Sequence, residues 1–441
     1  MTGLFGTDGV RGRANEYLTP ELSIAIARAA SSRVSKPGRV IIGRDTRTSG
    51  PMLEAALAAG FASAGLDVAL AGVIPTPAIS FLIKDEQAHL GAVISASHNP
   101  PEDNGIKLFD RRGMKLSVKE ERKIERLVGQ DLPPVEAVGG IRPLEAAAAR
   151  YASFLIGTID ADGVDLSGMT IAVDCAFGAT GGIAPHVLRH LGATVVELNT
   201  AEDGARINQG CGSTHLDAIR TAVEANDADL GIAFDGDGDR VLLVDRDGET
   251  IDGDRMIGIA ALHMRKIGSL DPPLVVTTIM SNLGLEETLG RHGIGMIRTP
   301  VGDRNVAQAM VERGAKLGGE QSGHIIFSDH SPTGDGILTV VKLLEIAHES
   351  GSDITSLAAT IELYPQVHRN VPCRAPFEAA GAPQVQAAVR EAEAALKGRG
   401  RVIVRPSGTQ PILRIMVEGE DERTCAEVCS LIEEGIRRLL L

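Results

Sequence analysis

Three aspartates separated by single glycines form a dense cluster of negative charge in the stretch IAFDGDGDRV. Asp235, Asp237 and Asp239 follow an apolar run, residues 230–234, which is typical of a buried strand. Because glycine permits a tight backbone, the three carboxylates can turn inward together. Three hard oxygen ligands suit Mg²⁺ and leave room for a phosphate oxygen. The pattern predicts a magnesium site, with Arg240 as a cation beside the phosphoryl group.

The calcium loop of an EF-hand is an alternative for this stretch, since it also opens with D-x-D-x-D. That loop needs glycine at its sixth position and glutamate at its twelfth. Here these positions hold Arg240 and Arg246, so the calcium loop is excluded. A polar aspartate–glycine turn without a metal remains the second alternative.

A serine beside a histidine follows another apolar run, in VISASHNPPEDNGIKLF, residues 93–109. Ser97 next to His98 indicates a nucleophile, but the hydrolase elbow G-x-S-x-G lacks both its glycines here. The chain has no Gly-Lys dipeptide of an ATP-binding loop, and GCGSTH lacks the third glycine of a dinucleotide fingerprint. With a metal triad and arginines available, the expected electrophile is phosphorus. The alternative is a serine that only caps a turn.

A phosphate site is predicted in RPSGTQP, residues 405–411. An arginine, two hydroxyls and free backbone N–H groups around a glycine suit a phosphate dianion. Arg414, on the strand expected to follow, could point back into this loop. An ordinary hairpin loop is the alternative.

A sugar site is predicted in GGEQSGH, residues 318–324. Glu320 and Ser322 are two positions apart, so in an extended loop both face the same side and could bind adjacent hydroxyls. His324 could move a proton, although a lone histidine is more often structural.

The overall charge restricts the class of ligand. The formal net charge is −14, so the whole chain repels polyanions, and an anionic substrate requires arginines gathered in one place. Arg11, Arg44 and Arg47, in the glycine-rich stretches FGTDGVRG and GRDTRTSG, could supply that local field. Tryptophan is absent and aromatic residues make up 3%, which argues against single-stranded nucleic acid as a ligand.

Three segments share the order strand, small-residue loop, helix, strand, which predicts parallel α/β units. They cover residues 39–73, 170–199 and 274–300. The tail differs, because residues 400–419 predict two strands joined by a Pro/Gly loop, followed by a helix from about Glu422. The fold class expected is therefore α/β: three α/β domains with mixed or parallel sheets and a smaller C-terminal α+β domain around a central cleft.

Turn-rich stretches at residues 131–143, 245–254 and 362–372 predict the domain boundaries. The expected domains are 1–150 with the serine loop, 151–250 with the metal loop, 251–365 with the sugar loop, and 366–441 with the phosphate loop. The five cysteines are scattered, which favours reduced thiols. No run of 18 apolar residues occurs, so we expect a cytoplasmic protein without a membrane segment.

Six motifs in this order resemble the α-D-phosphohexomutase superfamily, and within it the branch that acts on glucosamine phosphates. They are FGTDGVRG, ISASHNP, DNGIK, DGDGDR, GGEQSGH and RPSGT, spread from Phe5 to about Gly419. The resemblance implies that Ser97 carries a phosphate and binds Mg²⁺ together with Asp235, Asp237 and Asp239.

The motifs above and the resemblance together give the remaining site residues. The resemblance implies the roles of Lys107, His324 and the residues of the phosphate loop. The catalytic candidates are Ser97, Lys107, His324, His98, Arg11 and Arg240. The substrate-binding candidates are Glu320, Ser322, Thr299, Arg405, Ser407, Gly408, Thr409 and Arg414. Lys107 could accept a proton only as a neutral amine, which needs burial or neighbouring cations; a surface lysine is the alternative.

The expected reaction converts glucosamine 6-phosphate to glucosamine 1-phosphate, which feeds UDP-N-acetylglucosamine and cell-wall precursor synthesis. Phosphorylated Ser97 would give its phosphoryl group to the sugar, and the resulting 1,6-bisphosphate would turn round and return the other one. A hexosamine or hexose 1,6-bisphosphate is thus the expected activator, with one Mg²⁺ per chain, and a hinge is expected near residues 362–372. The partner is a small sugar phosphate rather than nucleic acid or membrane, and the chain could form a homodimer. The alternatives are a phosphoglucomutase or phosphomannomutase of the same superfamily, and a non-catalytic sugar-phosphate-binding paralogue.

Two departures from the superfamily pattern are visible. Gln410 stands where glutamate is usual after RPSGT, which puts the tuning of the phosphate loop in question. Pro101 and Glu102 stand where an aromatic residue is common, at the edge of the site.

Overall fold

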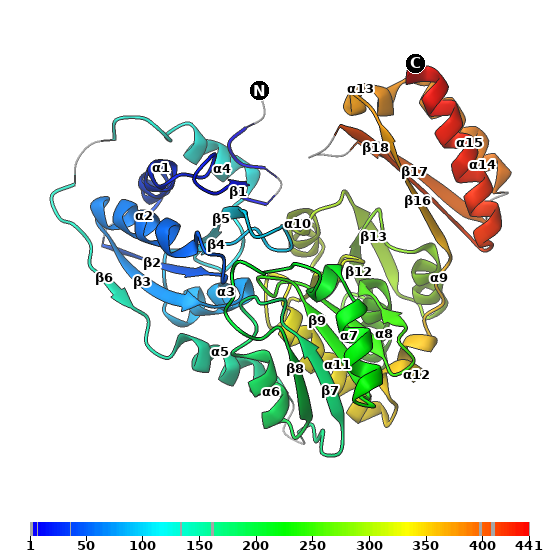
Figure 1. Ribbon diagram of the computed structural model, residues 1–441, viewed down its shortest axis with the longest axis horizontal. Coiled ribbons are helices and arrows are strands. Elements are labelled where there is room, and N and C mark those ends of the chain that lie inside the picture. The colour runs from blue at the N-terminus through cyan, green and yellow to red at the C-terminus, as the bar shows by residue number, and fades with distance from the viewer. Residues whose placement is uncertain are drawn as a thin grey trace. The chain divides into compact units, whose positions relative to one another are not determined.

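The structure is a computed structural model that describes residues 3–6, 8–35, 37–132, 135–159, 163–396, 399–406 and 411–440, without the side chains of 438–440 (Figure 1). The chain forms two compact units. The large unit comprises Met1–Met280 and Gly293–Thr360, and the small unit comprises Ser281–His292 and Ile361–Leu441.

The first sheet of the large unit has six strands in the order β1-β5-β4-β2-β3-β6. Its strands are β1 (Val10–Arg13), β2 (Gly38–Arg44), β3 (Leu66–Val73), β4 (Leu90–Ile94), β5 (Asp103–Asp110) and β6 (Ile141–Pro143). Its helices are α1 (Pro20–Ser31), α2 (Gly50–Ser63), α3 (Thr76–Asp85) and α4 (Val118–Glu125). Strand β2 pairs in parallel with β3 and β4, whereas β5 runs antiparallel to both β4 and β1.

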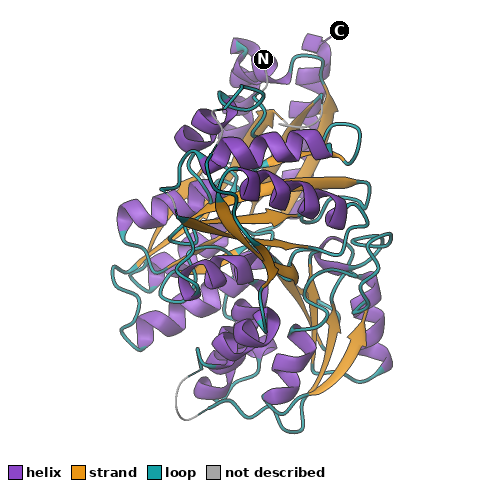
Figure 2. Cartoon of the chain, turned by 90° about the vertical axis from the view of Figure 1, so that its left-hand side faces the viewer, coloured by secondary structure: helices purple, strands orange, loops and turns teal. Residues whose placement is uncertain are grey.

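Both faces of this sheet are covered by helices (Figure 2). Val40 and Ile42 of β2 share a buried cluster with Leu53 and Leu57 of α2. On the other face α3 lies so close that a Cβ atom on Gly43 would come within 2.6 Å of the Ile79 side chain. Burial on both faces explains the nearly continuous apolar sequence of β2 and β4. The parallel unit predicted for residues 39–73 is confirmed.

The second sheet has the order β11-β10-β9-β7-β8, and the third has the order β13-β12-β14-β15. The second contains β7 (Thr170–Asp174), β8 (Thr194–Leu198), β9 (Leu230–Phe234), β10 (Val241–Asp245) and β11 (Thr250–Ile251), with helices α5 (Ala147–Ile156), α6 (Ala184–His190) and α7 (Asp217–Ala225) and the short 3₁₀ helix η1 (Gly212–Thr214). The third contains β12 (Leu274–Thr278), β13 (Gly295–Thr299), β14 (Leu317–Gly319) and β15 (Ile325–Phe327), with helices α8 (Gly253–Lys266), α10 (Asp303–Arg313), α11 (Gly336–Ser350) and α12 (Ile354–Ala359). The pairs β7–β8 and β12–β13 are parallel, as predicted for residues 170–199 and 274–300.

Ion pairs join the first sheet's layer to helix α10 of the third. Arg304 donates both Nη groups to the Glu121 carboxylate, at 2.6 and 2.7 Å, and the two side chains are 12% and 4% exposed. Lys115 contacts Asp303 and lies 2.5 Å from Asp8. We call Glu121–Arg304 and Lys115–Asp303 the inter-sheet ion pairs.

The small unit is an antiparallel sheet of order β16-β18-β17 with four helices among the described residues. Its elements are α9 (Leu283–Arg291), β16 (Gln366–Pro372), α13 (Pro376–Gly381), α14 (Pro383–Ala395), β17 (Gly400–Pro406), β18 (Ile412–Gly419) and α15 (Glu422–Leu440). The predicted hairpin and C-terminal helix are present. The segment 362–372 is not only a linker, because Val371 of β16 is buried in the core of this unit. The expected hinge there stays a prediction.

The predicted fold class is confirmed, with three α/β sheets and a smaller α+β unit. The four domain boundaries stay predictions. None of the described helices is long and apolar enough to cross a membrane. All five cysteines are buried and free of disulfides.

Candidate active site

Ser97 lies in the loop after β4, buried and in a left-handed backbone conformation with φ 54°. Its Oγ donates a hydrogen bond of 2.6 Å to Asp235 Oδ2 and lies 3.3 Å from His98 Nδ1. Its backbone N–H donates to Ser95 Oγ at 2.8 Å, and Ser95 Oγ donates to Asp45. The structure therefore brings the predicted serine to the predicted metal triad, although 138 positions separate Ser97 from Asp235.

The three aspartates follow β9 and are all buried, with one oxygen of each within 4.8 Å of the others. Burial, and then the charges of Asp239 and Asp237, raise the pKa of Asp235 well above its usual range. Asp237 Oδ1 and Asp239 Oδ1 are buried without a hydrogen-bond partner among the described residues. Orphaned carboxylate oxygens that converge in this way fit a hard divalent cation such as Mg²⁺.

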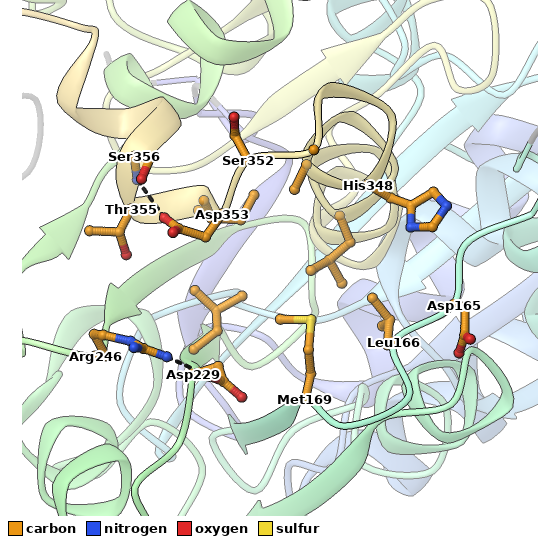
Figure 3. Close-up of a pocket in the computed structure, with 15 residues that line it drawn as sticks. Asp165, Leu166, Met169, Asp229, Arg246, His348, Ser352, Asp353, Thr355 and Ser356 are labelled. Atoms are coloured by element: carbon orange, nitrogen blue, oxygen red, sulfur yellow. Dashed lines mark hydrogen bonds and ion pairs between the residues drawn. The ribbon is translucent and has the colours of Figure 1, made fainter.

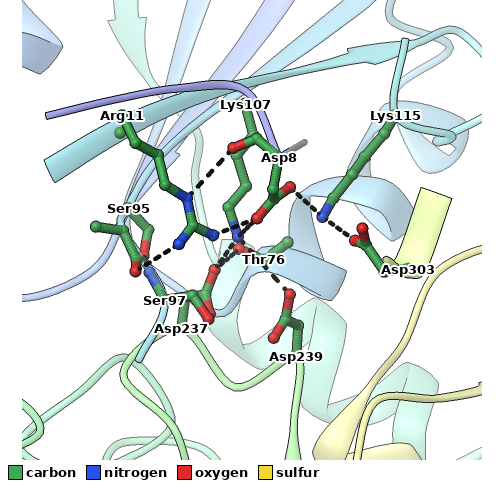
Figure 4. A network of polar contacts seen from close by, with 12 residues as sticks. Asp8, Arg11, Thr76, Ser95, Ser97, Lys107, Lys115, Asp237, Asp239 and Asp303 are labelled. Atoms are coloured by element: carbon green, nitrogen blue, oxygen red, sulfur yellow. Dashed lines mark hydrogen bonds and ion pairs between the residues drawn. The ribbon is translucent and has the colours of Figure 1, made fainter. Parts of the chain in front are cut away.

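Lys107, on β5, inserts its ammonium among these carboxylates (Figure 4). Its Nζ lies 2.7 Å from Asp237 Oδ2, 3.2 Å from Asp8 Oδ2 and 3.7 Å from Asp239 Oδ2, and the side chain is 1% exposed. Burial alone would lower the pKa of Lys107, but the three carboxylates outweigh it and raise the pKa above the ordinary lysine value. The lysine is buried, as its role would require, yet these contacts favour the charged form rather than the expected neutral amine.

Arg11 and Arg240 supply positive charge on two sides of the triad. Arg11 forms an ion pair with Asp8 and donates to the Ala96 carbonyl at 3.2 Å. Arg240 Nε lies 3.9 Å from Asp239 Oδ1 and has no hydrogen-bond partner in the described part of the chain. Burial, followed by the charges of Arg240 and Arg11, lowers the pKa of His98 to about 4. The imidazole is therefore neutral in a positively charged surrounding that suits a phosphoryl group.

His324 is held on both sides of its ring. Its Nδ1 lies 3.6 Å from Asp239 Oδ2, and its Nε2 accepts a hydrogen bond of 3.1 Å from the Gly334 N–H. Since an acceptor nitrogen carries no proton, the neutral ring has its hydrogen on Nδ1, facing Asp239. A Cβ atom on Gly334 would lie 2.4 Å from the ring, so only glycine allows this contact. The geometry favours orientation of Asp239 over the proton transfer expected for His324.

The sugar loop is a tight turn and not the extended loop that was expected. The Gly323 N–H donates to the Glu320 carbonyl at 3.0 Å, and the Glu320 N–H donates to the His324 carbonyl at 3.0 Å. Glu320 is buried and accepts from the Gly302 N–H, whereas Ser322 is exposed. The prediction that both side chains share one side because the loop is extended was wrong, since Gly323 adopts φ 89° and reverses the chain. Thr299 lies at the end of β13, with Oγ1 bonded to the carbonyls of Thr277 and Pro300.

Two of the three loop arginines contact neighbouring protein groups. Arg44 lies on β2, 3.4 Å from Glu54. Arg47 is fully buried, and its guanidinium bonds Asp45 and main-chain carbonyls of the serine loop. All the guanidinium donors of Arg47 therefore have acceptors, whereas for Arg44 acceptors lie at Nε and Nη1. The local positive field expected from these arginines stays a prediction.

The small unit holds the described part of the predicted phosphate loop. Arg405 and Arg414 face each other as partners on β17 and β18. Burial and the charge of Arg414 lower the pKa of Arg405. Arg414 Nε is buried and has no hydrogen-bond partner among the residues described. Two like charges side by side suit an anion. Ser407, Gly408, Thr409 and Gln410 lie outside the described residues.

Sequence reasoning missed four residues that the structure places around the site. Asp8 lies within FGTDGVRG, but the sequence analysis did not select it. Thr76, at the start of α3, donates a hydrogen bond from Oγ1 to Asp237 Oδ2 at 2.5 Å. Lys115 and Asp303 are 188 positions apart and extend the charge network past Asp8 (Figure 4). Only the motif around Asp8 could have indicated its role, since the other three lie outside any local pattern.

A cavity of about 460 Å³ lies elsewhere in the large unit (Figure 3). Its lining includes the apolar side chains of Leu166, Met169 and Leu344 and the ion pair between Arg246 and Asp229. None of the predicted site residues lines it.

Comparison with known proteins places the chain in a family. Four domains described as phosphoglucomutase/phosphomannomutase match in order: alpha/beta/alpha domain I at residues 2–132, domain II at 149–248, domain III at 252–364, and the C-terminal domain at 369–434. A phosphoglucosamine mutase of Desulforudis audaxviator is 47% identical over 445 residues, covering 99% of this chain and 98% of that protein. One from Saccharopolyspora erythraea is 47% identical, covering 98% and 99%.

Solved structures agree on the fold. A phosphoglucomutase/phosphomannomutase family protein from Burkholderia thailandensis superposes with a TM-score of 0.82 at 24% identity, over 99% of this chain and 98% of that chain. An N-acetylphosphoglucosamine mutase of Aspergillus fumigatus, solved with GlcNAc-6P and magnesium, gives 0.71 at 17% identity, over 99% and 96%. With all four domains matched and full-length relatives at 47% identity, the chain belongs to the phosphoglucomutase/phosphomannomutase family.

Proposed function

We propose that this chain is an isomerase that converts glucosamine 6-phosphate to glucosamine 1-phosphate through a phosphorylated Ser97. The observation that carries the proposal is the hydrogen bond of 2.6 Å from Ser97 Oγ to Asp235, within a buried triad of aspartates. The full-length relatives named phosphoglucosamine mutase support the choice of substrate. The partner is a small sugar phosphate, and the five buried free thiols support a cytoplasmic location.

Asp235, Asp237 and Asp239, with an oxygen on Ser97, are the proposed holders of Mg²⁺. When bound, the ion neutralises charge on the transferring phosphoryl group. Arg240, whose Nε has no hydrogen-bond partner among the described residues, is the proposed protein contact to that group. Because little covalent chemistry is needed, positioning and charge supply most of the catalysis.

Proton transfer is assigned to Lys107. When the phosphoryl group leaves Ser97 for a sugar hydroxyl, the O–P bond at Ser97 breaks, the Ser97 oxygen takes a proton from Lys107, and the sugar hydroxyl gives its proton to water. The return transfer reverses both proton movements. Lys107 Nζ holds its proton among Asp237, Asp8 and Asp239, so it is the proposed acid, and after donation it can serve as the base for the return transfer. His324 orients Asp239 in this scheme.

Two further sets of substrate contacts are proposed. Glu320, Ser322 and Thr299 are proposed on the sugar side. Arg405, Ser407, Gly408, Thr409 and Arg414 are proposed for the phosphate that does not react. A 1,6-bisphosphate is the proposed intermediate and activator, and a homodimer stays a prediction.

The test is turnover with Mg²⁺ after priming by glucose 1,6-bisphosphate, comparing glucosamine, glucose and mannose 6-phosphates. We expect the highest kcat/KM for the glucosamine substrate, by roughly 10–200-fold. Peptide mass spectrometry should find phosphate on Ser97 and none on its neighbour Ser95, and Ser97→Ala should lose nearly all turnover. Preference for mannose or glucose phosphate would change the substrate assignment, and normal turnover by Ser97→Ala would exclude the phosphoserine mechanism.

A further inference from the structure

All the guanidinium N–H groups of Arg47 donate hydrogen bonds, to Asp45 and to main-chain carbonyls of residues 97–103, which we call the serine loop. Nε donates to Asp45 Oδ2 at 2.9 Å. Nη1 donates to the carbonyls of Asp103, at 2.8 Å, and Pro100. Nη2 donates to the carbonyls of Ser97, at 2.9 Å, and Asn99, at 2.7 Å. A guanidinium has five N–H donors, so this set is complete.

Asn208, from the loop between β8 and η1, approaches the same carbonyls from the second sheet. Its Nδ2 donates to the Ser97 carbonyl at 2.8 Å and to the Asn99 carbonyl at 3.0 Å. Each of these two carbonyl oxygens therefore accepts two hydrogen bonds, which fills both lone pairs. Four main-chain carbonyls of residues 97–103 are fixed in direction by two buried side chains.

Asn208 also lies against the metal loop. A Cβ atom on Gly236, between two of the aspartates, would lie 2.9 Å from Asn208 Nδ2 and 2.8 Å from the Ser97 carbonyl oxygen. The serine loop, Asn208 and the metal loop are thus in direct contact. A shift of the Ser97 carbonyl would change the place of Ser97 Oγ relative to Asp235.

The fixed carbonyls explain how Ser97 keeps an unfavourable backbone. A left-handed conformation at a residue other than glycine persists only where the surroundings over-determine it. Ser97 has φ 54°, and its own N–H bonds Ser95 Oγ. The hydrogen bonds at its carbonyl hold the other side of the residue.

We propose that Arg47 and Asn208 are positioning residues for phosphoryl transfer, because they hold the loop that aims Ser97 Oγ at Asp235. Both donate to the main-chain carbonyl of Ser97, so both act through the main chain. The proposal rests on the proposed function of Ser97. A misplacement of about 1 Å can cost a hundredfold in rate, so loss of these donors should lower kcat and leave KM nearly unchanged.

The first test variant is Asn208→Gly. Asn208 has φ 60°, which glycine adopts freely, so the change removes both donors without straining the backbone. The matched control is Asn15→Gly, at an exposed asparagine with φ 61°. Arg47→Lys is the second variant, because lysine keeps the charge but has three donors in place of five. Asn208→Asp, which keeps the shape and has no donor, replaces Asn208→Gly if that variant fails to fold.

Two readouts separate positioning from general stability. Hydrogen exchange should be faster at the amides of Ser97, Asn99 and Asp103 in the Asn208 and Arg47 variants, while Asn15→Gly matches the wild type. In the same variants kcat should fall about 10–100-fold, with KM for the sugar phosphate and the Kd for Mg²⁺ within about threefold of wild type.

Each outcome decides one claim. Wild-type kcat in a folded Asn208→Gly or Asn208→Asp variant would overturn the proposal, as would a loss confined to KM. If the wild-type chain turns over no hexose phosphate, the proposed function falls, and loop exchange then decides alone whether these residues hold Ser97. Hydrogen exchange at the wild-type rate in both the Asn208 and the Arg47 variants would refute the claim that these residues hold Ser97.

Discussion

Asp235→Asn should stabilise the metal-free protein, although Asp235 is a proposed metal ligand. The carboxylate oxygens of the triad lie within 4.8 Å of one another. At that separation two negative charges repel by about 3.5 kcal/mol with an effective dielectric constant near 20. Lys107 and Arg240 offset part of this repulsion, so we expect a net gain of about 1–3 kcal/mol in the free energy of unfolding.

The sign depends on pH. Because the pKa of Asp235 is raised in the folded chain, its penalty is absent when the group is protonated in both states, below about pH 4. The penalty grows as the pH rises above about 4, where the unfolded chain loses its proton, and stops growing once the pH passes the raised folded-state pKa. The gain from Asp235→Asn should therefore increase from pH 4 towards higher pH.

The assay is thermal unfolding in EDTA and again in Mg²⁺. In EDTA the Tm of Asp235→Asn should exceed that of the wild type by a few degrees. Mg²⁺ should raise the Tm of the wild type. At a Mg²⁺ concentration a hundred times Kd, the free energy of unfolding of the wild type should increase by about 2.7 kcal/mol, and that of the variant by much less.

Asp174→Asn is the matched control, at the end of the adjacent strand β7. Asp174 is also fully buried, and three N–H groups, of Ala176, Gly212 and Asn199, donate to it. Asp235 Oδ2, by contrast, accepts from the Ser97 hydroxyl, which can turn and accept from an amide instead. An amide in its place would set a donor against donors, so this variant should lose about 1–3 kcal/mol. If Asp235→Asn is destabilised in EDTA as Asp174→Asn is, repulsion does not dominate the triad and our account of its charges is refuted.

Three further predictions follow from the charges. Lys107→Met should lower kcat by about 10²–10⁴-fold and strengthen Mg²⁺ binding in calorimetry, because the competing ammonium is gone; full turnover would contradict its role. Arg405→Gln should raise KM at least about tenfold without lowering the Tm, since it relieves repulsion from Arg414; an unchanged KM would argue against a phosphate site. Burial would raise the pKa of Asp8, but Lys107, Lys115 and Arg11 lower it well below its usual range. The stability that ionised Asp8 contributes should therefore be complete above about pH 4 and lost at lower pH. In urea unfolding between pH 6 and pH 3, Asp8→Asn should make the free energy of unfolding depend less steeply on pH. An equally steep dependence in the variant would exclude Asp8 as its source.

The parts of the site that sequence reasoning predicted are those encoded by short motifs. The aspartate triad follows one strand and Ser97 follows another, so local apolar patterns located both. The sheets were predictable for the same reason, since strand and helix periods differ within each unit.

The parts that could not be predicted depend on contacts between distant segments. Arg47 was expected to add to a local positive field because it lies in a glycine-rich stretch, and only the fold shows that main-chain carbonyls accept from both of its Nη groups. The turn at Glu320 depends on the left-handed Gly323, which a two-residue spacing does not reveal. The charge state of Lys107 is set by three carboxylates from two segments remote from β5.

The inter-sheet ion pairs have a consequence for recombination between relatives. Glu121 lies in helix α4 and Arg304 in helix α10, 183 positions apart, so a chimaera with a crossover between them inherits one partner from each parent. Burial raises the pKa of Glu121 to about 7 even beside Arg304, so a parent that lacks the arginine would leave a buried acid without its cation. Such an unpaired group costs about 3–5 kcal/mol. Functional chimaeras should therefore come from crossovers that transfer both residues together, or from parents that share the pair.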